Sequence, residues 1–254
     1  MGKIIAITNQ KGGVGKTTTS VNLAASLAVA KCRVLLIDLD AQGNAAMGCG
    51  IDKQEVEFSS YDLLMEDVPA AQAVVHLPGI GFSVISGNAD LTAAEVKLIN
   101  ADRKEQRLAD ALMPIKADYD YILIDCPPSL NMLTLNAMVA ADSLLIPMQC
   151  EYYALEGLSA LMSTLQNIQS SVNPELHLEG ILRTMYDDRN RLTKDVSEQL
   201  IRYFGDKVFR TCIPRNIRLA EAPSYGLPAI SYDKSSRGSL AYVALANEMI
   251  ERNK

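Results

Sequence analysis

A glycine-rich stretch near the start of the chain combines residue types that bind phosphate. Residues 7–20 read ITNQKGGVGKTTTS. Its glycines let the backbone curl so that successive N–H groups point at anionic oxygens. Lys16 can reach the β- and γ-phosphates of a nucleotide, and the Thr17 hydroxyl can bind Mg²⁺. The residues of this loop that we expect to bind the nucleotide of the same chain are Gly12, Gly13, Val14, Gly15, Lys16, Thr17 and Thr18.

The loop departs from the common phosphate-binding pattern at its first position. That pattern has Gly, four residues, and then Gly-Lys-Ser/Thr. Here Gln10 stands where the first glycine belongs, and a second lysine, Lys11, follows it. The three later glycines supply the curvature, so the phosphate-binding interpretation holds. The departure raises the question of what Lys11 does.

Three aspartates follow apolar, strand-like runs. VLLID ends on Asp38, Asp40 comes two residues later, and YILID ends on Asp125. Acids at the carboxyl ends of parallel strands, beside a phosphate loop, hold Mg²⁺ or its water shell. We therefore expect Thr17, Asp38 and Asp125 to form the magnesium site. Period-two alternation would place Asp38 and Asp40 on one face, with one of them orienting the attacking water.

The elements that must position these residues alternate between strands and helices. Short apolar runs predict strands and are too continuous for a half-exposed sheet, so both faces should be covered. Strand–helix alternation predicts a doubly wound, mostly parallel α/β fold, with residues 1–254 as a single domain. Residues 50–81 are the least regular part and should carry a helix or two. Strands are expected at 3–8, 33–38, 82–86, 121–126, 143–148, 178–185 and 207–213, and helices at about 16–30, 103–116, 130–141, 155–171, 193–204 and 237–252.

Charge is distributed unevenly along the chain. The formal net charge is −6, yet residues 183–237 carry eleven Lys or Arg and a net +4, whereas residues 117–182 carry no Lys or Arg. A basic third on an acidic body suggests an anionic partner. The five cysteines form no C-x-x-C pair, and no apolar run approaches a membrane span, so we expect a cytoplasmic protein.

Taken together, five motifs resemble the ParA/Soj family of partition ATPases. They are KGGVGKTT, LIDLDAQGN, IDCPPSL, PMQCEYYALEGL and IPRNIRLAEAPSYGLP, in family order from residue 2 to about 250. This is a branch of P-loop proteins with a deviant Walker A loop. The resemblance implies an ATP hydrolase with Mg²⁺ that forms a homodimer on ATP and binds non-specific DNA. It also implies a ParB-type activator and association with the nucleoid in the ATP-bound form.

The resemblance also assigns roles to single residues. Lys11 matches the signature lysine that crosses the dimer to the partner's phosphates, as an arginine finger does. Catalysis is thus expected from Lys11, Lys16 and Asp40, with Asp40 activating water. Pro214 and Asn216 match positions that hold adenine, and no guanine-specific Asn-Lys-x-Asp element is present. The chain departs from the family pattern at Ala41, Ala46 and Asn131, around the nucleotide switch.

Two arginines in the basic third match family positions that bind DNA. These are Arg189 in YDDRNRLT and Arg218 in PRNIRL. Arg215 is close enough in sequence to the adenine segment to be structural. Two copies facing the same way would double the local charge, so a dimer would bind DNA far better than a monomer. Weaker candidates are Arg191, Arg215, Lys234 and Arg237.

Three other functions use the same architecture. A MinD-like membrane-site ATPase needs a basic amphipathic tail, whereas the tail SLAYVALANEMIERNK has only Arg252 and Lys254 and reads as a packed helix. A nitrogenase-reductase-like enzyme needs paired cluster cysteines, which Cys126 and Cys150 do not provide by their spacing. A flagellar-placement or transcriptional regulator is separated only weakly by sequence.

Overall fold

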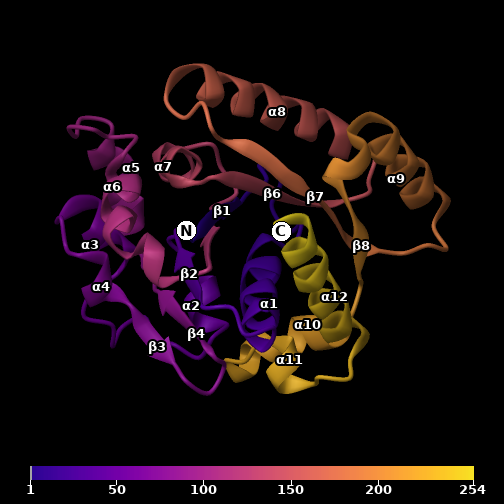
Figure 1. The fold of residues 1–254 in the computed structure, drawn as a ribbon, viewed down its shortest axis with the longest axis horizontal. Coiled ribbons are helices and arrows are strands. Elements are labelled where there is room, and N and C mark those ends of the chain that lie inside the picture. The colour runs from indigo at the N-terminus through magenta and orange to yellow at the C-terminus, as the bar shows by residue number, and fades with distance from the viewer. Residues whose placement is uncertain (1) are drawn as a thin grey trace.

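An eight-stranded sheet organises the computed structural model, which describes residues 2–254. The strand order is β3-β4-β2-β5-β1-β6-β7-β8, and only the edge pair β3–β4 is antiparallel. Both faces carry helices (Figure 1). The doubly wound α/β prediction is therefore confirmed. The strands are β1 (Lys3–Ile7), β2 (Val34–Asp38), β3 (Val75–Leu77), β4 (Phe82–Ile85), β5 (Tyr121–Asp125), β6 (Ser143–Gln149), β7 (His177–Tyr186) and β8 (Val208–Pro214).

The helices form two layers, and each layer has its own apolar core. In one core, helices α3 through α8 pack against one face of the sheet. In the other core, helices α1, α2 and α10 through α12 pack against the opposite face. A third cluster lies between β6, α8 and α9. The helices are α1 (Lys16–Val29), α2 (Asn44–Met47), α3 (Ser60–Met65), α4 (Ala70–Ala73), α5 (Leu91–Leu98), α6 (Arg107–Leu112), α7 (Met132–Ala140), α8 (Ala154–Ser171), α9 (Arg191–Phe204), α10 (Ile217–Glu221), α11 (Ala229–Tyr232) and α12 (Arg237–Arg252), with 3₁₀ turns η1 (Met113–Asp118), η2 (Gly205–Lys207) and η3 (Ala222–Tyr225).

Strand β2 shows why its sequence reads as a continuous apolar run. Leu35 and Ile37 pack into one core, and Leu36 packs into the other. Successive strand residues point to opposite faces, so a strand covered on both sides needs apolar residues at every position. The last residue of the strand, Asp38, is a buried carboxylate at the carboxyl end of β2.

The predicted helix at 103–116 is the least accurate of the predicted elements. The α-helix covers only Arg107–Leu112, and residues from Met113 onward form the 3₁₀ turn η1. Pro114 has no backbone N–H to continue the α-helical ladder, which explains the change. Helices α2, α5, α10 and α11 were not predicted, because four to eight residues give too little helical periodicity. Residues 50–81 do carry two short helices, as expected, together with the edge strand β3.

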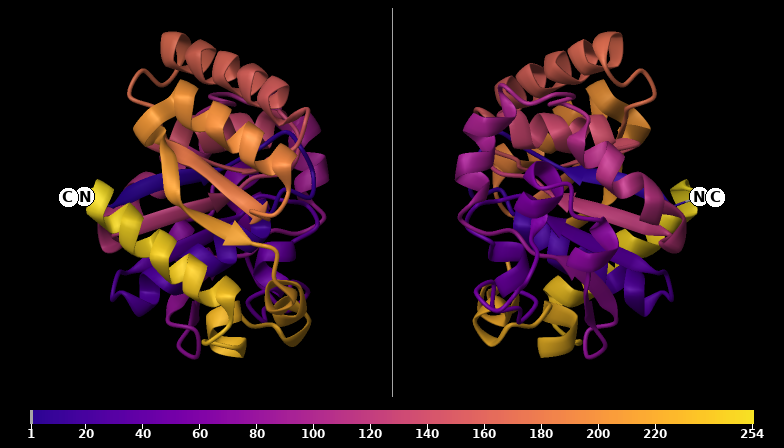
Figure 2. Two further views of the ribbon diagram at one scale, coloured as in Figure 1. Left: turned by 90° about the vertical axis from the view of Figure 1, so that its right-hand side faces the viewer. Right: turned by 90° about the vertical axis from the view of Figure 1, so that its left-hand side faces the viewer.

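The first strand and the last helix meet at one end of the molecule. Lys3 Nζ donates to Asn253 Oδ1 over 2.6 Å, and both side views place the two chain ends next to each other (Figure 2). Helix α12 buries Tyr242, Leu245 and Met249 against the core. The C-terminal segment is therefore a packed helix, as predicted. No helix within residues 2–254 is long and apolar enough to cross a membrane.

Candidate nucleotide-binding site

The glycine-rich loop links the carboxyl end of β1 to the first turn of α1. Gly13 and Gly15 have φ values of +72° and +87°, which side chains other than glycine rarely adopt. Gly15 is the N-cap of α1, so the unpaired N–H groups and positive dipole end of the helix open at the loop. Thr184 Oγ1 donates to the Val14 carbonyl over 2.8 Å and fixes the buried middle of the loop to β7.

Lys16 folds back across this loop. Its Nζ lies 3.2 Å from the Lys11 carbonyl oxygen, and only 7% of the residue is exposed. Burial lowers the pKa of Lys16, although the negative charge of Asp125 opposes that effect. A buried ammonium in the first turn of α1, beside the unpaired backbone N–H groups of the helix, suits an anion with several oxygens.

Asp125 ends β5 and receives two hydroxyl hydrogen bonds from α1. Thr17 Oγ1 donates to Asp125 Oδ2 over 2.8 Å, and Ser20 Oγ donates to Oδ1 over 2.7 Å. Burial raises the pKa of this carboxyl to about 6, against the opposing effect of the two hydroxyls. Ser20 was not predicted, although it lies one helical turn after Thr17 and therefore on the same face of α1.

Asp38 lies beside Asp125 because β2 and β5 are neighbours with these two residues in register. The Asp38 carboxylate accepts from the backbone N–H groups of Asp40 and Ala46, each over 3.0 Å. Burial raises its pKa to about 8, and the charge of Asp125 adds to that effect. Two buried carboxyl groups side by side resist ionising together, and a divalent cation would compensate the charge of both.

The prediction that Asp38 and Asp40 share a strand face is wrong. Strand β2 ends at Asp38, so Asp40 lies in the following turn, where its Oδ1 accepts from Gln42 N over 2.9 Å. Gly87 lies against this turn, since a Cβ there would come within 2.8 Å of the carbonyl oxygens of Asp38 and Asp40. A glycine at 87 is thus required to hold the turn in place, and no local sequence signal identifies it.

A magnesium ion fits the donor set at this edge of the sheet. Mg²⁺ prefers oxygen ligands, keeps several waters and is commonly bound through one or two carboxylates together with phosphate oxygens. Thr17, Asp38 and Asp125 offer a hydroxyl and two carboxylates. Within residues 2–254, no group of three or more His, Cys, Asp or Glu side chains could hold a metal alone. The phosphates of a nucleotide would supply the remaining ligands.

Lys11 forms an ion pair with a residue that is distant in the sequence. Its Nζ lies 2.5 Å from Glu151 Oε2, just beyond β6, and both side chains are about half exposed. The Lys11 backbone N–H donates to Asn9 Oδ1 over 3.0 Å, which orients the residue. Glu151 was not predicted, because 140 residues separate it from Lys11.

A pocket of about 190 Å³ lies between the phosphate loop and the segment that follows β8. Gly15 and Thr18 line it together with Pro214 and Asn216, which come from the end of β8 and the start of α10. The structure thus brings the two residues matched to adenine binding next to the phosphate loop. Asn216 also caps α10, because its Oδ1 accepts from Arg218 N over 3.0 Å.

The two arginines matched to DNA binding both pair with carboxylates. Arg189 is highly exposed and makes a bidentate contact with Asp187, with both distances 2.9 Å. That contact lowers the pKa of Asp187 to about 2, and the charge of Arg215 contributes. Arg218 Nη1 lies 2.7 Å from Glu221 Oε2, and its Nε lies 3.4 Å from Asp233 Oδ2.

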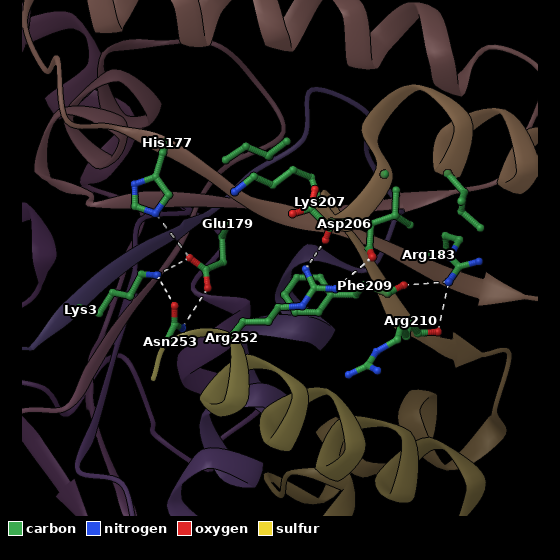
Figure 3. Close-up of a pocket in the computed structure, with 14 residues that line it drawn as sticks. Lys3, His177, Glu179, Arg183, Asp206, Lys207, Phe209, Arg210, Arg252 and Asn253 are labelled. Carbon is green, nitrogen blue, oxygen red and sulfur yellow. Dashed lines mark hydrogen bonds and ion pairs between the residues drawn. The ribbon is translucent and has the colours of Figure 1, made fainter.

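Another hollow, of about 730 Å³, lies at the opposite edge of the sheet (Figure 3). Three of its polar side chains, Lys3, Glu179 and Asn253, pair with one another. Glu179 is the extra residue of a β-bulge in β7, and its carboxylate lies 2.5 Å from Lys3 Nζ. Ser143 and Asn253 also donate to Glu179. Contacts in this hollow therefore connect the first strand to the end of the chain, and none of its lining residues belongs to the phosphate loop.

Three comparisons with known proteins show which proteins this chain is similar to. A family described as an AAA domain matches residues 2–178. The chromosome partitioning protein ParA of Myxococcus xanthus is 52% identical over 254 residues, covering 100% of this chain and 89% of that protein. The sporulation initiation inhibitor protein Soj of Bacillus subtilis is 53% identical over 249 residues, covering 98% of each. The crystal structure of cobyrinic acid a,c-diamide synthase from Mycobacterium smegmatis with bound ADP and magnesium is similar at 35% identity and a TM-score of 0.84, covering 97% and 93% of the two chains.

Proposed function

This chain belongs to the ParA/Soj family of chromosome-partitioning P-loop ATPases, and from that premise we propose that it is an ATP-gated switch on DNA. ATP binding joins two copies across their nucleotides, and the dimer binds DNA without sequence preference. Hydrolysis then releases the DNA. We propose that residues 1–254 act as one ATPase domain, which the single sheet from β1 to β8 supports.

The observation that carries this proposal is the cluster at the carboxyl edge of the sheet. Asp38, Asp125, Thr17 and Lys16 converge there on the N-terminus of α1. The related solved protein with ADP and magnesium supports the same ligands here. Bound Mg²⁺ would bridge phosphate oxygens and offset their charge. The pocket beside Pro214 and Asn216 would take the adenine.

Three residues are proposed to act on the phosphates. Lys16 neutralises charge on the β- and γ-phosphates within its own subunit. Asp40, in the turn after β2, accepts a hydrogen bond from the attacking water and so orients it. Lys11 reaches the phosphates of the second copy, leaving Glu151, and stabilises the charge that develops during hydrolysis. Dimerisation and hydrolysis are coupled in this way.

DNA binding is proposed to use Arg189 and Arg218. The net charge of +4 over residues 183–237 becomes +8 in a dimer whose copies face the same way. Each neutralised phosphate would contribute about −0.9 to the salt slope. A ParB-type protein is the proposed activator of hydrolysis, and the ATP-bound dimer would associate with the nucleoid.

The test is binding to unrelated DNA duplexes with ATP, with ADP and without nucleotide, across a salt series. We expect tight binding with ATP alone, equal affinity for unrelated sequences and a steep salt dependence. Lys11→Ala should retain ATP but lose dimerisation and DNA binding. Equal DNA affinity in all three nucleotide conditions would refute the switch.

A further inference from the structure

The guanidinium group of Arg218 already has protein partners in this structure. Its guanidinium contacts carboxylates of Glu221 and Asp233 and lies over the Tyr232 ring, 6.0 Å from the centroid. The side chain remains 44% exposed. DNA phosphate would have to compete with two carboxylates for the same guanidinium donors. Exposed ion pairs are individually weak, so a small change in the position of either carboxylate would change how well DNA phosphate competes for Arg218.

The two carboxylates lie at different points of one folded segment, which we call the arch (residues 217–233). Glu221 ends α10, and Asp233 follows α11. Arg218 thus ties the beginning of the arch to its end. Tyr225 stacks on Tyr232 with ring centroids 4.9 Å apart, which holds the middle of the arch against the same end. Moving the middle of the arch would therefore disturb the Arg218 contacts.

The middle of the arch rests on the segment that follows Asp38. Gly226 has φ +63°, and a Cβ there would come within 2.7 Å of Gly50 Cα. Gly50 has φ +81°, and a Cβ there would come within 3.0 Å of the Gly226 carbonyl oxygen. Two glycine backbones in direct contact leave no flexible side chain between them to absorb a displacement. The contact transmits movement in either direction.

The segment 38–50, which we call the nucleotide loop, is held by the proposed magnesium ligand. The Asp38 carboxylate accepts from the backbone N–H groups of Asp40 and Ala46. Beside the Gly50–Gly226 contact, a hollow of about 400 Å³ lies between this loop and the arch. Thr17 and Thr18, which follow the phosphate loop, also line this hollow. A change at the carboxylate of Asp38 would act on the loop, and through Gly50 on the arch.

We propose that Glu221 and Asp233 mask Arg218, and that the nucleotide loop controls this mask through the Gly50–Gly226 contact. Binding of nucleotide and metal at Asp38 shifts the loop, the arch opens, and Arg218 becomes available to DNA phosphate. This inference rests on the proposed function, since it assigns the regulation of the same DNA site. It adds a route within one subunit to the effect of dimerisation.

A double-mutant cycle tests the mask. The Glu221→Gln/Asp233→Asn variant should bind DNA roughly three- to tenfold more tightly with ADP than the wild type does. The same pair of changes should have no effect in an Arg218→Ala background. Glu198→Gln, an exposed acid of the same basic third, is the matched control and should give less than a twofold change. An equal gain with and without Arg218 would mean general charge repulsion and would overturn the mask.

A glycine pair tests the control by the nucleotide loop. Gly226→Ala should reduce the ratio of DNA affinities with ATP and ADP at least about threefold, while ATP binding is retained. Gly81→Ala is the control, because Gly81 also has φ +82° but its Cβ would meet only Ala28 Cβ at 3.7 Å. An unchanged ratio in Gly226→Ala that still binds ATP would overturn the coupling. Should that variant unfold, the same ratio of DNA affinities is measured for Gly50→Ala, which changes the other residue of the contact.

The two levels of proposal fail in different ways. A wild-type protein that shows no ATP-dependent DNA binding refutes the proposed function itself. A wild-type protein that binds DNA only with ATP, together with variants that leave this dependence intact, refutes the mask and its control alone.

Discussion

Buried carboxylates occur at both edges of the sheet, and they differ in what surrounds them. At the carboxyl edge, Asp125 accepts from two neutral hydroxyls and Asp38 accepts from two backbone N–H groups. At the amino edge, Glu179 contacts the ammonium of Lys3 (Figure 3). Burial raises the pKa of Asp38 and Asp125. At Glu179 burial also acts to raise the pKa, but the contact with Lys3 and the hydrogen bonds from Ser143 and Asn253 together outweigh it, so the pKa is lowered. Buried carboxylates thus have pKa values shifted in opposite directions at the two edges.

The difference separates a carboxylate that binds from one that holds the fold together. A buried charge with a fixed counter-charge is already compensated and has no need of a ligand. Asp38 and Asp125 form no such ion pair among the described residues, and two adjacent buried carboxylates raise the free energy of the folded state until a cation reaches them. The carboxyl edge is therefore the place where ligand binding and stability are linked.

The largest expected effect comes from neutralising the carboxyl edge. Asp125→Asn should lower ATP hydrolysis at least about 100-fold, because a carboxylate that assists metal binding is lost. Thermal stability should be unchanged or higher, since the Thr17 and Ser20 hydroxyls can rotate to suit an amide. Steady-state hydrolysis and thermal unfolding measure the two effects. A large loss of stability would mean that Asp125 is structural, like Glu179.

Neutralising the amino edge should do the reverse. Glu179→Gln leaves Lys3 without its partner and should cost about 2–3 kcal/mol of unfolding free energy, which is below the range for a fully buried pair because the Lys3 side chain is 22% exposed. ATP hydrolysis per folded molecule should stay within about twofold of wild type. Urea unfolding and the hydrolysis assay provide the comparison. Strongly reduced hydrolysis at full stability would contradict it.

The pH dependence of stability should differ in sign between the edges. Asp125 has a folded pKa raised from 3.8 to about 6, so the folded state binds the proton more tightly and stability falls as pH rises from about 4 to 6. The gain of Asp125→Asn over wild type should grow across that window, to at most about 3 kcal/mol. Glu179 has a lowered folded pKa, so its contribution is present above about 4.5 and is lost as pH falls through the folded value. Unfolding curves of both variants at several pH values test the two signs, and parallel trends would be evidence against the distinction.

The smallest effect is expected for a second lysine–glutamate pair of the same length. Lys11 and Glu151 lie 2.5 Å apart, like Lys3 and Glu179, but both are about half exposed. Glu151→Gln should therefore change the unfolding free energy by less than about 0.5 kcal/mol. Chemical denaturation beside Glu179→Gln checks this. A cost equal to that of Glu179→Gln would show that exposure does not separate the two pairs.

Much of the site follows from short stretches of sequence. The turn at Gly13 and Gly15, the start of α1 at Lys16 and the strand ends at Asp38 and Asp125 were all predicted, because each depends on neighbouring residues. The continuous apolar runs and the alternation of strands with helices also predicted the mostly parallel sheet. Asp40 was misplaced because period-two alternation does not continue past Asp38, where β2 ends and the turn begins.

The remaining features depend on which distant segments the fold brings together. Glu151 beside Lys11, Thr184 on Val14 and Gly87 against Asp40 all involve residues far apart in sequence. The sequence by itself determined that the chain has a phosphate loop, strand-terminal acids and a basic third. Tertiary structure alone decided which carboxylates gained a counter-charge and which did not. The physical reason is that strand order and register set these neighbours, and they depend on packing across the whole sheet rather than on any local pattern.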